Sequence, residues 1–211
     1  MTEETRIAVD AMGGDGGPSI IMPSIKDFLS THNDVKIEVF GDENLIHKYT
    51  NKFEESILKN IKIIHASEKV LSSDSPSHAL RHKKNSSMSL AIESVKNKRT
   101  QACVSAGNTG ALMAISRFIL GTLDGIDRPA IETMLPSLCG HTHVLDLGAN
   151  IDCKAEHLYQ FAVMGSVLSM ILDDKSNPRV GLLNVGQEAI KGNMQVKEAH
   201  DLLKNNNINY V

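Results

Sequence analysis

Short runs of β-branched and apolar residues alternate with segments of helical periodicity along this chain, and this alternation constrains its fold more than any other feature. The predicted strands span residues 6–10, 35–40, 61–65, 102–105, 143–147 and 179–184. Strands that alternate with helices form βαβ units, whose strands lie parallel in one sheet. The sequence therefore predicts an α/β fold with a mostly parallel sheet.

Most of these runs are compact and apolar, as expected of strands that are buried on both faces. The run 35–40 differs, because Lys36 and Glu38 alternate with apolar residues there. Such alternation is typical of a strand with one solvated face. We therefore expect this strand to be less covered than the others.

Several helices are marked by their ends. Ser75 and Ser86 are predicted N-caps, because a serine oxygen can accept an N–H group of the first turn. Gly121 is predicted to end the helix whose apolar stripe begins at Ala111. A second long apolar stripe covers residues 158–172, which predicts a helix buried on several sides.

Length and composition fit a single α/β domain over residues 1–211, with segment 122–142 as a crossover between lobes. The net charge is −3 and the isoelectric point is near 6.3, which argues against a nucleic-acid-binding protein. The three cysteines show no CxxC spacing, so neither a zinc knuckle nor a disulfide framework is expected. The N-terminal residues lack the pattern of a signal peptide, and a reducing cytosol is the expected setting.

Polar, glycine-rich loops follow four of the predicted strands. They cover residues 11–18, 106–110, 148–152 and 185–193. In open α/β sheets, ligands bind outside the C-terminal ends of the strands. We therefore expect these loops to converge on one ligand site.

The loop from Ser105 to Gly110 is the best candidate for binding phosphate, because its glycines let backbone N–H groups approach an anion at a helix N-terminus. An equally good interpretation is a tight turn in which Asn108 only caps the helix. The loop matches neither GxGxxG nor the Walker motif, so NAD and ATP lose their usual sequence support. No cofactor is expected.

Charged residues in the other loops have two interpretations each. Asp10 and Asp15 flank the first loop and could bind a metal or a donor group, or could cap turns. Asp152 could take part in a site or cap the following helix. Lys191 lies in a loop beside a glycine, where it could neutralise an oxyanion or be an ordinary solvated lysine.

A basic run from His78 to Lys84 is expected on the helix that Ser75 opens. It could receive an acidic carrier or a phosphate, although a charge run is more often a solvated face. His141 and His143 place both rings on one face of a strand, but no third ligand is evident nearby. A metal site is therefore not expected.

At the glycine-rich loops the chain resembles the PlsX family of bacterial acyl-ACP:phosphate acyltransferases. The matching stretches are IAVDAMGGDGGP (7–18), SSMSLAIESV (86–95), ACVSAGNTGALMA (102–114), GIDRPAIETMLP (125–136), LDLGANIDC (145–153), LYQFAVMG (158–165) and GLLNVGQEAIKGN (181–193). They keep the family's order and cover nearly the whole chain.

The resemblance implies a three-layer α/β/α fold related to phosphotransacetylases and to the isocitrate/isopropylmalate dehydrogenases. It also implies a reaction in which an acyl group passes from acyl carrier protein to inorganic phosphate. The acyl phosphate then serves phospholipid synthesis through a downstream glycerol-3-phosphate acyltransferase. A cytoplasmic homodimer with peripheral membrane contact is the expected state.

Roles for individual residues follow from the resemblance as hypotheses. Phosphate or acyl phosphate is expected to bind at Ser105, Gly107, Asn108 and Thr109. Asn150 and Lys191 would polarise the thioester carbonyl, with Glu188 orienting Lys191. The remaining expected substrate-binding residues are Asp10, Gly13, Gly14, Asp15, Gly148, Asp152 and Asn184, with Arg81 and Lys84 meeting the carrier.

The chain also departs from the family pattern. Gln187 stands where glutamate is frequent, and Gly16 replaces a frequently larger residue. Family members continue beyond Val211, so the chain is expected to be the N-terminal part of a longer fold. Two alternatives therefore stay open: a short-chain phosphate acyltransferase that uses acyl-CoA, and an inactive fragment that at most binds the carrier or self-associates.

Overall fold

The computed structural model describes residues 4–138, 140–148, 150, 152–186 and 191–211. The chain divides into two compact units, Met1–Gly121 and Thr122–Val211, each of which is described by itself. The segment 122–142 begins the second unit. Its role as a crossover within one domain stays a prediction.

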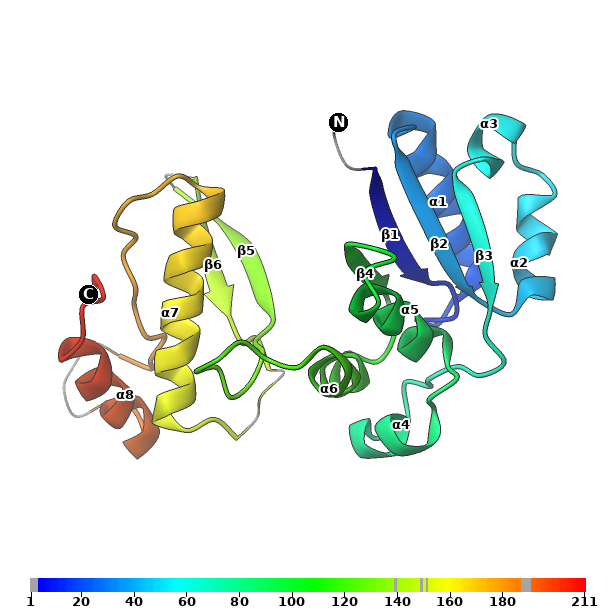
Figure 1. The fold of residues 1–211 in the computed structure, drawn as a ribbon. Coiled ribbons are helices and arrows are strands. Elements are labelled where there is room, and N and C mark those ends of the chain that lie inside the picture. The colour runs from blue at the N-terminus through cyan, green and yellow to red at the C-terminus, as the bar shows by residue number, and fades with distance from the viewer. Residues whose placement is uncertain (1–3, 139, 149, 151, 187–190) are drawn as a thin grey trace. The chain divides into compact units, whose positions relative to one another are not determined.

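The first unit contains a four-stranded parallel sheet in the order β3-β2-β1-β4 (Figure 1). The strands are β1 (Thr5–Asp10), β2 (Val35–Gly41), β3 (Ile61–His65) and β4 (Ala102–Ser105). Each of them confirms a predicted run to within one residue at either end. The parallel order confirms the predicted α/β class for this unit.

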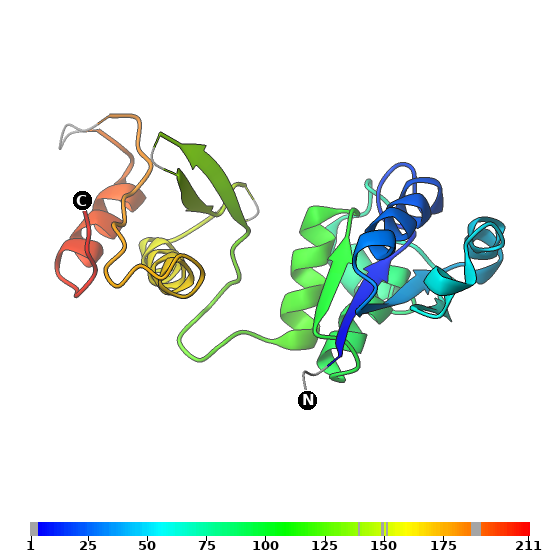
Figure 2. The ribbon, with the colours of Figure 1, turned by 90° about the horizontal axis from the view of Figure 1, so that it is seen from above.

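Helices cover both faces of this sheet, which gives three layers (Figure 2). Alternate strand residues face opposite ways: Val9 and Val39 pack in a cluster with Met22 of α1, whereas Ala8 packs with Ala91 of α5. The helices of the unit are α1 (Pro18–Thr31), α2 (Glu43–Thr50), α3 (Glu55–Leu58), α4 (Pro76–His82), α5 (Ser87–Lys96) and α6 (Thr109–Leu120).

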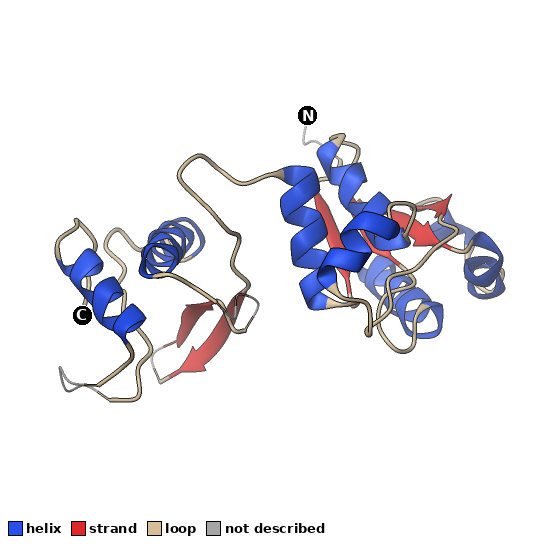
Figure 3. Ribbon diagram, turned by 90° about the horizontal axis from the view of Figure 1, so that it is seen from below, coloured by secondary structure: helices blue, strands red, loops and turns tan. Residues whose placement is uncertain are grey.

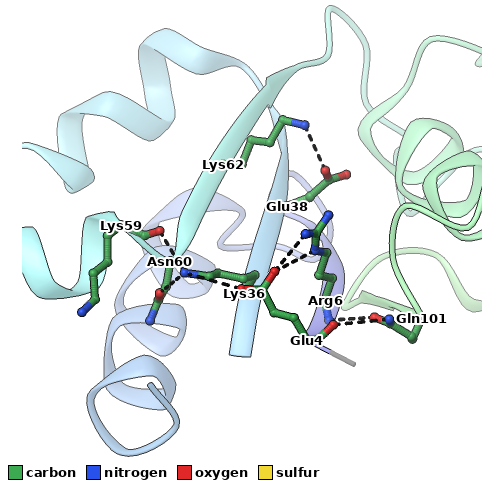
Figure 4. Close-up of polar contacts among 8 residues, drawn as sticks. All are labelled: Glu4, Arg6, Lys36, Glu38, Lys59, Asn60, Lys62 and Gln101. Atoms are coloured by element: carbon green, nitrogen blue, oxygen red, sulfur yellow. Dashed lines mark hydrogen bonds and ion pairs between the residues drawn. The ribbon is translucent and has the colours of Figure 1, made fainter. Parts of the chain in front are cut away.

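The prediction of a less covered strand at 35–40 is wrong. β2 lies between β1 and β3, and Glu38 is only 6% exposed. Its carboxylate accepts hydrogen bonds from Ser94 Oγ (2.9 Å) and Lys62 Nζ (3.2 Å; Figure 4). Burial alone would raise the pKa of Glu38, but these two partners outweigh it and hold the pKa below its usual value.

The register between β1 and β4 is fixed at the start of both strands by Gln101 (Figure 4). The side-chain Oε1 of Gln101 accepts a hydrogen bond from the backbone N–H of Arg6 (2.7 Å), and the backbone N–H of Gln101 donates to Arg6 O (2.9 Å). In this register Asp10 stands opposite Ser105 at the C-terminal end.

The predicted helix ends are confirmed. Ser75 Oγ accepts a hydrogen bond from His78 N, and Ser86 Oγ accepts one from Ser89 N. Gly121 follows α6 with a φ of 81°, which favours glycine. The basic run does not lie wholly on α4, because the helix ends at His82, before Lys84.

The second unit contains an antiparallel hairpin and two helices (Figure 3). The hairpin joins β5 (Glu132–Ser137) and β6 (Gly140–Leu145), and the helices are α7 (Ala155–Leu172) and α8 (Met194–Lys204). The helix predicted at 158–172 is therefore confirmed, but its predicted burial on several sides is wrong, because Val167, Met170, Ile171 and Leu172 are exposed. Within the described part of the chain, no helix combines the length and apolar character needed to cross a bilayer.

Two strand predictions in this unit need correction. The strand expected at 143–147 is β6, which lies earlier and pairs antiparallel with β5, a strand that sequence reasoning did not predict. Residues 179–184 form no strand, and only Val180 makes an isolated bridge, with Tyr210. An apolar run becomes a strand only when another segment is available to pair with it.

Candidate functional site

Asp10 and Ser105 join the first two glycine-rich loops at the C-terminal ends of neighbouring strands. Asp10 is 2% exposed, and its Oδ2 accepts a hydrogen bond from Ser105 Oγ at 2.7 Å. Its Oδ1 accepts another from Met12 N at 3.1 Å. Ser105 Oγ in turn accepts one from Gly107 N at 3.1 Å. This chain of hydrogen bonds fixes both turns relative to each other.

Glycine is required where these turns touch. A Cβ atom at Gly13 would lie 2.8 Å from both Asp10 Oδ2 and Gly107 N. One at Gly107 would lie 2.8 Å from Met88 Cε and 3.5 Å from Gly13 Cα. Gly14 has a φ of 75°, in the left-handed region. The structure therefore brings Asp10, Gly13, Ser105 and Gly107 together, as expected.

Asn108 is the N-cap of α6, and its amide also anchors a remote loop. Its Oδ1 accepts a hydrogen bond from Ala111 N at 3.0 Å. Its Nδ2 donates to the carbonyl oxygens of Leu71 (3.2 Å), Ser72 (3.2 Å) and Asp74 (2.9 Å). All polar atoms of this side chain are thus used within the fold, so Asn108 positions the turn.

The first turn of α6 still offers N–H groups to a ligand. Thr109 and Gly110 are its first residues, and N–H groups at such positions have no acceptor inside the helix. Together with the partial positive charge of the helix N-terminus, they suit an anion. Thr109 itself is exposed to solvent.

Other predicted residues of this unit lie on its surface. Asp15 is exposed in the first turn, Arg81 is exposed in the last turn of α4, and Lys84 is exposed between α4 and α5. Their roles in binding a donor stay predictions.

In the second unit, Asp146 organises the turn that contains Asn150. Asp146 has a φ of 66°, which is uncommon for any residue other than glycine. Its Oδ1 accepts hydrogen bonds from Asn150 N (3.0 Å) and Asn150 Nδ2 (3.1 Å). Asn150 Nδ2 also donates to Pro129 O (3.0 Å), so both N–H groups of this amide donate hydrogen bonds inside the fold. Asp146 was not predicted as a site residue, because it falls within the strand expected at 143–147.

Asn184 and Gly192 approach each other closely near Lys191. Gly192 has a φ of 87°, and a Cβ atom there would lie 2.9 Å from Asn184 Oδ1. Asn193 Oδ1 then accepts a hydrogen bond from Val196 N and caps α8. Lys191 is exposed beside this contact, and Glu188, predicted to orient it, lies outside the described residues.

Two predicted residues flank the turn of Asn150. Gly148 has a φ of 87°, so the chain requires glycine there. Asp152 is exposed and does not cap the next helix, because α7 begins after Lys154. The carbonyl oxygen of Asp152 instead accepts a hydrogen bond from Arg128 Nη1 at 3.3 Å. The convergence of the loops of the two units on one ligand site stays a prediction.

Neither described cysteine is suited to act as a nucleophile. Burial, with a smaller effect of Asp10, raises the pKa of Cys103 to about 12. Burial and the hydrogen bond from Cys153 Sγ to Asp146 raise the pKa of Cys153 to about 11. Both thiols are therefore protonated at neutral pH, whereas a thiolate is the reactive form.

The fold is that of phosphotransacetylases and related dehydrogenases. The EutD phosphotransacetylase of Staphylococcus aureus superposes with a TM-score of 0.63 at 17% identity, over 99% of this chain and 67% of that one. A 4-hydroxythreonine-4-phosphate dehydrogenase of Burkholderia phymatum superposes with a TM-score of 0.55 at 12% identity, over 100% of this chain and 74% of that one. The three-layer α/β/α class is thereby confirmed.

The family follows from closer relatives. The model of the family described as "Fatty acid synthesis protein" matches residues 5–211, and the chain belongs to this family, the PlsX family. It is 53% identical to a phosphate acyltransferase of Methylococcus capsulatus, over 98% of this chain and 61% of that protein. It is 51% identical to one of Nitrosococcus oceani, over 97% of this chain and 60% of that protein. The chain thus spans about 60% of these relatives' length.

Proposed function

We propose that this chain belongs to an enzyme that transfers a fatty acyl group from acyl carrier protein to inorganic phosphate. The acyl phosphate formed would serve phospholipid synthesis. One observation carries the proposal: in a chain whose relatives are named phosphate acyltransferase, Asp10 and Ser105 fix two glycine turns beside the N-terminus of α6. We further propose a cytoplasmic homodimer that contacts the inner face of the membrane peripherally and supplies a glycerol-3-phosphate acyltransferase.

Phosphate binding is proposed at the N–H groups of the first turn of α6. These groups need no proton transfer to hold a dianion, and their positions are set before the ligand arrives. The Asp10 carboxylate is buried and accepts two hydrogen bonds from within the unit, so we assign it to holding the turns. Ser105 and Asn108 act as positioning residues for this turn, through the contacts described above.

The proposed reaction is a direct displacement. An oxygen of hydrogen phosphate attacks the thioester carbonyl carbon, and the carbonyl oxygen becomes an oxyanion. The carbonyl then re-forms as the C–S bond breaks, and the leaving thiolate takes up the proton that the phosphate loses, which gives acyl phosphate and the free carrier thiol. Phosphate is already anionic near neutral pH, so alignment and oxyanion stabilisation are the main requirements. We assign Lys191 to stabilising the oxyanion and Asn150 to maintaining the conformation of the turn in which it lies. Arg81 and Lys84 would meet the acidic carrier.

The test uses the 211-residue chain with acyl-ACP, and with acetyl-CoA as a competing donor. Formation of acyl phosphate, trapped as a hydroxamate, should require phosphate and favour acyl-ACP. A preference for acetyl-CoA would instead support the short-chain alternative. No turnover with either donor would support the inactive fragment.

Lys191→Ala should lower the rate of acyl-phosphate formation about 10²-fold, as expected for the loss of one group that stabilises an oxyanion. The matched control is Lys197→Ala on α8, which should retain the rate of the unmodified chain. An unchanged kcat in Lys191→Ala would remove this residue from the proposed role.

A further inference from the structure

A cluster of two histidines and one aspartate lies in the second unit, apart from the glycine-rich loops. His141 and His143 are two positions apart on β6, so their side chains share one face of the hairpin. Asp173 follows the last residue of α7. His141 Nε2 lies 2.8 Å from Asp173 Oδ1, and His143 Nε2 lies 3.1 Å from Asp173 Oδ2. The third group missing from the local sequence is thus supplied by a residue 30 positions further along.

The cluster is largely shielded from water. The side chains of His143 and Asp173 are 5% and 8% exposed, whereas that of His141 is 33% exposed. The three potential ligand atoms all lie within 4.8 Å of one another. One ion could therefore reach all three, and the exposed side of His141 leaves room for water as a further ligand.

Glu132 on β5 orients one of these rings. Its Oε1 lies 2.7 Å from His143 Nδ1, on the side of the ring opposite to Asp173. A carboxylate in this place fixes the proton on Nδ1 and leaves Nε2 to bind a metal, an arrangement common among metal-ligating histidines. Asp173 is held in turn by Ser169 Oγ, which donates to Oδ2 at 2.8 Å.

We propose that His141, His143 and Asp173 bind one zinc ion that joins the β5–β6 hairpin to the end of α7. Two imidazole nitrogens and one carboxylate oxygen are ligands that zinc prefers, and water completes the coordination. The proposal is independent of the proposed function.

The test is zinc binding by the 211-residue chain after treatment with a chelator. Equilibrium dialysis against zinc chloride should give one zinc per chain, and cobalt in its place should produce visible d–d absorption. Zinc at about 100 times its Kd should raise the Tm by about 5–11 °C. His141→Asn and Asp173→Asn should each weaken binding by more than about 100-fold, which exceeds the usual loss for an outer-shell partner.

Glu132→Gln should keep the stoichiometry but weaken binding about 10–100-fold, because it removes only the orienting carboxylate. The matched control is His78→Asn, which alters a histidine–aspartate pair elsewhere in the chain, that of His78 with Asp74. Far-UV circular dichroism of each metal-free variant confirms that it is folded. The proposal is overturned if the unmodified chain binds no zinc, which would leave a salt-bridged cluster only. It is equally overturned if the His141 and Asp173 variants retain binding, or if the His78 variant loses it.

Discussion

Replacing Asn108 by alanine removes the N-cap of α6 and the anchor of residues 71–74 in one step. Loss of the Oδ1 cap costs about 1 kcal/mol of stability, and the hydrogen bonds donated by each of the two amide N–H groups contribute about 1 kcal/mol net. We therefore expect Asn108→Ala to lower the free energy of unfolding of the first unit by about 2–3 kcal/mol. Urea titration followed by far-UV circular dichroism measures this change.

Asn108→Ser separates the two contributions. Serine caps a helix about as well as asparagine but cannot reach out with an N–H group, so this variant should lose about 1 kcal/mol less than the alanine variant. Equal losses in the two variants would refute the assignment of the cap. A loss below about 0.5 kcal/mol in Asn108→Ala would show that neither contact stabilises the unit, since ordinary surface substitutions have effects of that size.

Two further predictions concern the same unit. Gly13→Ala should lower the free energy of unfolding by about 1–3 kcal/mol, because the added Cβ would press on the backbone N of Gly107. Thermal unfolding measures this loss. The control is Gly181→Ala, whose added Cβ would have its nearest neighbour at 3.9 Å and should change the stability little. Ser94 and Lys62 hold the pKa of Glu38 below its usual value despite burial. The ionised side chain therefore stabilises the fold at pH values above the pKa of glutamate in the unfolded chain. This stabilisation is lost as the pH falls through the lower pKa of the folded chain. The stability difference between the native chain and Glu38→Gln, followed by urea titration at several pH values, should therefore shrink on acidification, and a constant difference would contradict this explanation.

The sequence was sufficient to predict features that depend on neighbouring residues. The caps at Ser75, Ser86 and Asn108 bond within three residues, so their patterns are local. The four strands of the first unit could be predicted because each is a short apolar run that is bounded by turns and helices, and the structure confirms them. The polar pattern of β2 misled the prediction, since Glu38 meets Ser94 from a helix 56 positions away.

Features that depend on distant pairing could not be predicted in the same way. The hairpin replaced a predicted parallel strand because β5 supplied a partner from a segment expected to be a crossover. Asp146 was missed because its importance lies in a left-handed backbone and in contacts with Asn150 and Cys153. The proximity of Asp10 and Ser105 could be expected, because parallel strands end at the same edge of a sheet, whereas their role in binding a ligand stays a prediction.

The hydrogen bonds between Gln101 and Arg6 have a consequence for the opposite edge of the sheet. Side chains alternate along a strand, so a slip of β4 by one residue would turn Ser105 to the other face and separate its hydroxyl from Asp10. The alignment of the turn that we propose to bind phosphate is therefore decided partly by the exposed side-chain amide of Gln101 at the far end of the strand. A one-residue insertion beside Gln101 would damage ligand geometry while touching none of the glycines.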